Sequence, residues 1–147
     1  MPSPTEILRK EHDKVLKVLD SMEKAINKKD AKQSEKLIAL LDREFSRHSL
    51  NKEEKVLFPE IEKFIPRDGG PTGVMLMEHK DLVDSIKKFK EAAKSRNFGK
   101  MNESGSHIIS VLRQHIDKEN GPLFMIADMH LDDKQKETII KKFKKFD

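Results

Sequence analysis

Two parts of this 147-residue chain carry the same spacing of histidines and glutamates. In each part a Glu-His pair is followed 36 residues later by a second histidine, and a glutamate comes soon after it, leading into Leu-Phe. The residues that share this pattern are His12, His48 and Glu53 in the first part, and His79, His115 and Glu119 in the second. Four imidazoles and two carboxylates in pseudo-two-fold register are what a two-metal site in a helical bundle requires.

Each of these histidines lies in a line of apolar residues spaced mostly by three and four, which is typical of the buried face of a bundle helix. Aromatic residues make up only 5% of the chain, with no Trp and no Tyr, which suits helices better than sheets. We expect one all-α domain, 1–147, folded as an antiparallel up-down four-helix bundle with a short C-terminal helix on one side. The expected helices span about residues 4–27, 31–65, 72–95, 100–127 and 132–146.

The apolar pattern of the second helix slips by one residue after His48. Continuing it would place Lys52 and Lys55 in the core, whereas Glu53, followed by apolar residues, fits the core if one residue is inserted. A single π-type turn absorbs such an insertion without breaking a helix, and these turns are common at functional sites. Counting about 1.5 Å of rise per residue from each turn puts the two histidines of each hairpin at nearly the same level. The connection over 59–71 must then fold back or overhang the end of the bundle.

A single histidine on a buried helix face is usually an ordinary core residue, and buried glutamates are costly unless they are paired or bind a cation. Six such residues at one level would need several unrelated compensations, whereas a metal centre removes the cost in one step. Nitrogen and oxygen donors without sulfur suit iron, manganese or zinc. Two shared carboxylates would bridge two ions and leave open positions for a small ligand. The Glu-x-x-His motifs of ferritin-like bundles do not occur here.

Over nearly its whole length the chain resembles the hemerythrin-like (HHE cation-binding) domains. The resemblance is carried by Glu11-His12, by His48 with Lys52-Glu53-Glu54-Lys-Val-Leu-Phe-Pro59, by Gly69-Gly-Pro-Thr-Gly-Val-Met-Leu-Met-Glu-His79, and by His115-Ile-Asp-Lys-Glu119 with Leu123-Phe124. It implies a four-helix bundle with two iron ions, bridged by oxo or hydroxo, that bind O2 or a related small ligand. It further implies that the four histidines are terminal metal ligands and that Glu53 and Glu119 bridge the ions.

Two positions depart from the family pattern. The first glutamate follows its histidine by five residues rather than four, which leaves Glu54 as an alternative bridge to Glu53. Oxygen-carrying members have a further histidine four residues after the one on the third helix, where this chain has Val83. The chain therefore resembles a four-histidine variant with more open coordination, which weakens the case for a simple reversible O2 carrier.

Other features limit the function without defining it. The chain has no cysteine, which excludes disulfides and thiolate metal sites. Its net charge of +4 is spread over the helices without a basic stripe, and we expect no nucleic-acid surface. No segment resembles a signal peptide or a membrane span, so we expect a soluble cytoplasmic protein. His107 and His130 lie outside the register and are expected at the surface. The methionines at 75, 77, 101, 125 and 129 are expected to fill the core.

These observations favour a protein that binds or senses O2, NO or peroxide at a di-iron centre. One alternative is a di-iron oxidoreductase that reduces peroxide or oxidises iron, using coordination left vacant at Val83. Another is an iron-responsive module whose folding is coupled to metal and whose protein partner is unknown.

Overall fold

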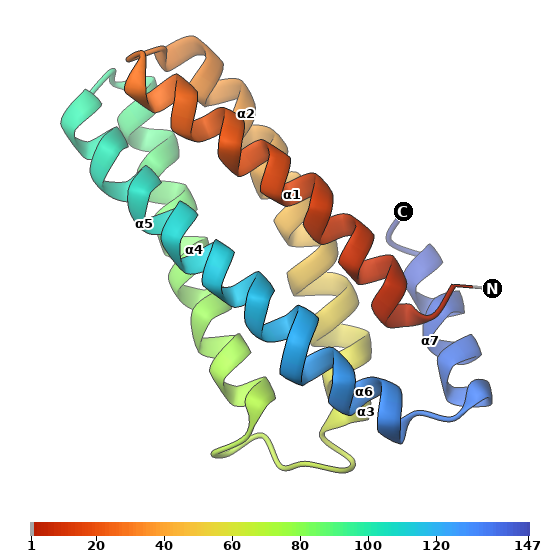
Figure 1. The fold of residues 1–147 in the computed structure, drawn as a ribbon. Coiled ribbons are helices and arrows are strands. Elements are labelled where there is room, and N and C mark those ends of the chain that lie inside the picture. Colours follow the sequence, from red (N-terminus) through yellow and green to blue (C-terminus); the bar gives the residue numbers. More distant parts are fainter. Residues whose placement is uncertain (1) are drawn as a thin grey trace.

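The computed structural model describes residues 2–147. They form a bundle of antiparallel helical columns, and a short last helix lies beside it, next to the N-terminal end of the first column (Figure 1). The first column is α1 (Pro4–Asn27). The second is α2 (Ala31–Phe45), continued by the π-helical segment η1 (Ser46–Leu57) and by α3 (Phe58–Ile61). The third is α4 (Pro71–Lys94). The fourth is α5 (Phe98–Lys118), continued by the π-helical segment η2 (Glu119–Leu123) and by α6 (Phe124–His130). The predicted all-α bundle is confirmed, and residues 2–147 contain no strand.

The last helix, α7 (Asp133–Lys144), packs against η1 and α1 near the N-terminal end of the chain (Figure 1). Asp132 caps it in a reciprocal box with Gln135, so the direction of α7 is fixed where it leaves α6. Ile139, Ile140 and Phe143 are buried along one of its sides. The connection from α3 to α4 is irregular and crosses the lower end of the bundle in Figure 1, as the sequence led us to expect.

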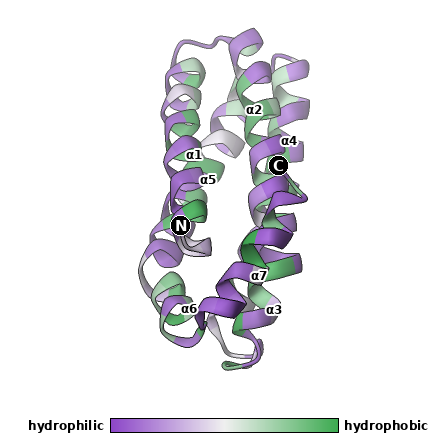
Figure 2. Cartoon of the chain, turned by 90° about the vertical axis from the view of Figure 1, so that its right-hand side faces the viewer, coloured by the Kyte–Doolittle hydropathy of each residue, from purple (hydrophilic) through white to green (hydrophobic). Residues whose placement is uncertain are grey.

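The apolar core is divided into two clusters, one on either side of the level of the histidines. The larger cluster lies toward the α1–α2 and α4–α5 turns and includes Leu19, Leu41 and Phe89. The smaller lies toward the α3 and α6 end and includes Phe58 and Phe124. Figure 2 shows apolar residues along the inward sides of the helices and polar residues on their outer sides. The polar centre between the clusters is thus screened from water along the bundle axis.

Two stretches of π-helix lie at the level of the histidines. The predicted π-type insertion after His48 is confirmed, but it extends over twelve residues, Ser46–Leu57, rather than a single turn. In a π-helix residues five apart share a face, which is why His48 and Glu53 both point inward. On the other hairpin, His115 lies in regular α-helix and reaches Glu119 four residues later, where η2 begins. We did not predict η2; it contains Pro122, which has no backbone N–H to donate.

Several expectations about individual residues were wrong. Lys52, which the shifted pattern assigned to the outside, is completely buried, because two carboxylates pair with its ammonium group. Met75 and Met101 are core residues as expected, whereas Met77, Met125 and Met129 are exposed. Within residues 2–147 no helix is both long and apolar enough to cross a membrane.

Candidate metal centre

The six residues of the sequence repeat lie together between the two apolar clusters. They come from all four columns and none is more than 4% exposed. His12 is on α1, His79 on α4 and His115 on α5. His48 and Glu53 are on η1, and Glu119 begins η2. These six residues are called the His/Glu centre below.

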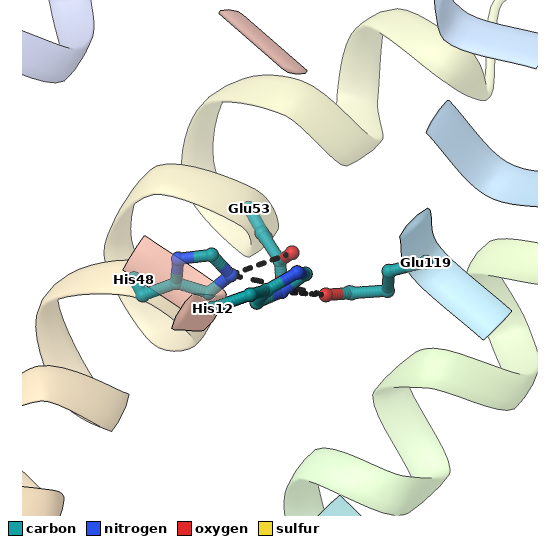
Figure 3. Close-up of side chains that lie close together, drawn as sticks. All are labelled: His12, His48, Glu53 and Glu119. Atoms are coloured by element: carbon teal, nitrogen blue, oxygen red, sulfur yellow. Dashed lines mark hydrogen bonds and ion pairs between the residues drawn. The ribbon is translucent and has the colours of Figure 1, made fainter. Parts of the chain in front are cut away.

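The donor atoms of the His/Glu centre form two groups that share both carboxylates. One group consists of His12, His48, Glu53 and Glu119, and Figure 3 shows their side chains converging. The other consists of His79, His115, Glu53 and Glu119. Within each group the donor atoms lie within 4.8 Å of one another. The arrangement has the form of two adjacent ion sites with two histidines each and two carboxylates in common.

In the first group each histidine is hydrogen-bonded to a different carboxylate. Nε2 of His12 lies 2.8 Å from Oε1 of Glu119. Nε2 of His48 lies 3.1 Å from Oε2 of Glu53 and 3.8 Å from Oε1 of Glu119. Figure 3 marks these contacts with dashed lines.

In the second group the Nε2 atoms of the two histidines lie close to each other. Nε2 of His79 lies 3.2 Å from Nε2 of His115 and 3.3 Å from Oε1 of Glu53. Nε2 of His115 lies 3.3 Å from Oε2 of Glu119. Among residues 2–147, neither Glu53 Oε1 nor Glu119 Oε2 has a hydrogen-bond partner, although both oxygens are buried.

The outer nitrogen of every histidine in the centre is held by an oxygen acceptor. Nδ1 of His48 donates to Glu11 Oε1 at 2.8 Å, and Nδ1 of His115 donates to Glu78 Oε1 at the same distance. Nδ1 of His79 donates to Glu54 Oε2 at 2.6 Å. Nδ1 of His12 donates to the side-chain oxygen of Asn120 at 2.7 Å. These four acceptors are called the outer partners below.

The outer partners determine the chemistry of the inner face. A carboxylate only accepts hydrogen bonds, so an imidazole facing one carries its proton on Nδ1. A neutral ring then presents the lone pair of Nε2 to the centre. Four such lone pairs meet two carboxylates, and no donor within the group satisfies them unless the rings take up additional protons. The donor set therefore fits a pair of cations, and the two carboxylate oxygens without partners fit as ligands of those cations.

The pKa values of three residues also indicate that the His/Glu centre favours positive charge. Burial on its own lowers the pKa of His115, but the carboxylates of Glu119 and Glu53 outweigh it and raise the pKa to about 9. The pKa of His48 is raised well above its usual value in the same way, by Glu53 and Glu11 against the effect of burial. Burial alone would raise the pKa of Glu119, yet the facing histidines hold it well below its usual range. The carboxylates that could hold cations thus also favour protonation of these two histidines.

The outer partners follow the sequence repeat, although we did not assign them roles from the sequence. Glu11 and Glu78 each precede the first histidine of a hairpin and bind the second one. Glu54 and Asn120 each follow a shared carboxylate and bind the first histidine of the other hairpin. The signal was present, because the Glu-His pair belongs to the repeat, but spacing alone does not say which ring nitrogen a glutamate contacts.

Glu54, the alternative bridge to Glu53, and Val83, which replaces a histidine of the oxygen-carrying members, both lie outside the two donor groups. Glu54 faces the outer side of His79, whereas Glu53 faces the centre. Val83 is 47% exposed. Val83 supplies no donor to either group, and the more open coordination predicted from it stays a prediction. His107 and His130 are also outside the centre and exposed, as expected.

One small cavity adjoins the centre. Its volume is about 10 Å³, and its polar lining includes His12, His48, His115 and Glu119. The rest of its lining is Val15, Leu41, Phe45, Ser49, Leu112 and Ile116. About 10–15 Å³ is the least space that accommodates one water molecule, so the cavity has the scale of a diatomic or single-solvent ligand. Two larger surface grooves, one between α4 and α5 and one between α1 and α5, are lined by none of the six residues.

A sequence model of the hemerythrin HHE cation-binding domain matches residues 3–127. The match includes the whole His/Glu centre and ends before α7. Comparisons with curated proteins and with solved structures give no match.

Proposed function

The chain belongs to the hemerythrin HHE cation-binding domain family, and we propose that it is a non-haem di-iron protein that takes up O2 or a related small ligand, NO or peroxide. The proposal is supported above all by the orientation of the four imidazoles. Each Nδ1 is held by an outer partner, so all four Nε2 lone pairs face two carboxylates that need cations. We assign His12, His48, His79 and His115 as terminal ligands and Glu53 and Glu119 as the shared ligands.

The division of the donors into two groups supports two ions rather than one. Each proposed ion has two histidines of its own and shares both carboxylates with its neighbour. Two histidines and two shared carboxylates leave each ion short of six ligands, so a small molecule has room to bind. The donors also suit manganese and zinc, and the preference for iron comes from the proposed uptake of O2.

The protein positions the metal ligands and selects which small molecules reach the metal ions. Iron, when bound, supplies the redox chemistry that O2 or peroxide requires. Glu11, Glu54, Glu78 and Asn120 fix the orientation of the imidazoles, and partners of this kind strengthen metal binding by about 10–100-fold. The two apolar clusters exclude bulk water from either side. The small cavity limits what can enter to molecules of a few atoms.

The test is metal analysis together with an optical spectrum. Protein from iron-replete cells should contain about two iron ions per chain and, once oxidised, should absorb in the near ultraviolet as an iron pair with a bridging oxygen does. Exposure to air and then to vacuum should change this spectrum reversibly. A preparation without metal, or with one zinc ion only, would rule the proposal out. Catalytic consumption of peroxide instead of stoichiometric uptake would favour an oxidoreductase with the same centre.

A further inference from the structure

Lys52 is fully buried although it carries an ammonium group. Its Nζ donates to Oε2 of Glu11 at 2.6 Å and to Oδ1 of Asp147 at 2.6 Å. It also lies 5.8 Å from the ring centroid of Phe143 on α7. A buried cation is unfavourable unless it is paired, and here one carboxylate comes from α1 and the other from the segment after α7.

These contacts connect the His/Glu centre to the end of α7. Glu11 accepts from Nδ1 of His48 with one oxygen and from Lys52 with the other. Lys52 in turn binds Asp147. The path from His48 through Glu11 and Lys52 to Asp147 is therefore a continuous row of short polar contacts, each between charged or ring groups.

The His79/His115 half of the centre repeats the contacts from histidine to glutamate to lysine, but its lysine is not buried. Lys118 precedes Glu119 as Lys52 precedes Glu53, and Lys118 binds Glu78, the outer partner of His115. The side chain of Lys118 is 43% exposed, whereas that of Lys52 is 1% exposed. The difference arises because α7 lies over Lys52, with Phe143 above its ammonium group.

We infer that α7 positions His48 through Lys52 and Glu11, so that metal binding at the His12/His48 half of the centre is coupled to the docking of α7 and binding at the His79/His115 half is not. This inference rests on the proposed function, because it needs two ions. Lys52 and Asp147 are positioning residues, since neither touches an ion site. The helix that provides this control lies beyond the residues of the family match.

Coupling between two sites acts in both directions. If the docked α7 raises the affinity of one half for its metal, that metal must stabilise the docked α7 by the same factor. The inference therefore has two independent readouts, metal affinity and the protection of α7.

The first experiment titrates metal-free protein with iron(II) under anaerobic conditions. Lys52→Met should weaken one of the two binding events by about 10–100-fold and leave the other unchanged. Lys118→Met is the matched control, and it should weaken binding by less than about 5-fold because water can replace an exposed lysine. Asp147→Asn keeps the Lys52–Glu11 contact and changes a half-exposed side chain, so it should fold even if Lys52→Met does not. It should weaken the same binding event as Lys52→Met.

The second experiment measures amide hydrogen exchange in α7 with and without iron(II). In the wild-type protein iron should slow exchange over residues 133–144, and in Asp147→Asn this slowing should be reduced. Absence of iron binding by the wild-type protein would overturn the proposed function itself. If the wild-type protein binds two ions but Lys52→Met and Lys118→Met lose iron affinity equally, this inference is overturned and the di-iron proposal stands. The same holds if iron does not change the rate of amide exchange in α7.

Discussion

Nε2 of His79 lies 3.2 Å from Nε2 of His115, although the outer nitrogen of each ring donates to a carboxylate. Two neutral rings held in this way would point lone pairs at each other, so the contact requires a proton or a metal ion between or beside them. The carboxylates of Glu119 and Glu53 raise the pKa of His115 to about 9, which favours the proton when no metal ion is bound. Because Glu54 and Glu78 hold the Nδ1 protons of these rings, the two Nε2 lone pairs face each other, and a proton or a metal ion beside them relieves their repulsion.

The first prediction separates the inner ligands from other histidines. His48→Ala and Glu119→Ala should each abolish loading with two iron ions, because one removes a terminal ligand and the other removes a donor shared by both groups. His107→Ala should load fully, since the hydrogen bonds of His107 within residues 2–147 go to Asp81 at the surface. Iron content per chain after reconstitution is the measurement. Loss of loading in His107→Ala alone would mean that the wrong face of α5 has been assigned.

The level of the centre and the helical seams could be predicted from the sequence because both depend on periodicity. Each histidine occupies a core position in its helix, and equal distances from a turn bring the partners in each hairpin to one level. The π-helical insertion was also visible, because one extra residue between His48 and Glu53 shifts the apolar pattern, and both residues lie in η1. The spacing of residues along the chain is therefore enough to predict these features.

Features that depend on distant pairs could not be read in this way. Lys52 becomes a surface residue once the apolar pattern is shifted by one residue, and its burial depends on Glu11 and Asp147, which are 41 and 95 residues away along the chain. Gly121 and Pro122 indicate a weak point in a helix but not that it becomes π-helical at Glu119. The exposed Met125 and Met129 follow apolar spacing in the sequence, yet α6 is too short and too close to the end of the bundle to be covered on that side.

A second prediction distinguishes the adjacent glutamates of η1. Glu53→Gln should impair both ions, because Glu53 belongs to both donor groups. Glu54→Gln keeps a hydrogen-bond acceptor for Nδ1 of His79 but removes its charge, so it should weaken one ion only, by about 10-fold. Anaerobic iron(II) titration of both variants gives the two affinities. Equal impairment of both ions by Glu54→Gln would show that Glu54, not Glu53, is the shared ligand.

A third prediction concerns protons. The facing carboxylates raise the pKa of His115 to about 9 and raise the pKa of His48 in the same direction, so protonation of both rings is favoured when no metal is bound. Metal ligands must be deprotonated, and filling the centre should therefore release protons. Because His115 keeps its proton up to a pKa of about 9, metal affinity should rise with pH through the neutral range and level off near pH 9.

Calorimetry in two buffers with different ionisation enthalpies counts these protons directly. The difference between the two heats should equal the number of protons released multiplied by the difference between the two ionisation enthalpies. The same titration with His115→Gln, in which one titrating ring is absent, should show a smaller release from whatever metal still binds. Identical heats in both buffers would contradict the assignment of protons to the metal-free centre.

The last prediction uses the small cavity beside the centre. Val15 lines it on α1, is not a ligand, and belongs to the larger apolar cluster. Val15→Leu adds a methylene to the wall of a cavity of about 10 Å³, so uptake of NO by the iron-loaded protein should become slower and weaker. Overpacking should lower the free energy of unfolding by about 1–3 kcal/mol, which a stable bundle tolerates. Val15→Ala widens the same wall and should speed uptake at a cost of about 1–2 kcal/mol. Stopped-flow mixing with NO, at equal iron content in all three proteins, compares the rates. If both substitutions leave the rate unchanged, the ligand reaches the iron from another side of the bundle.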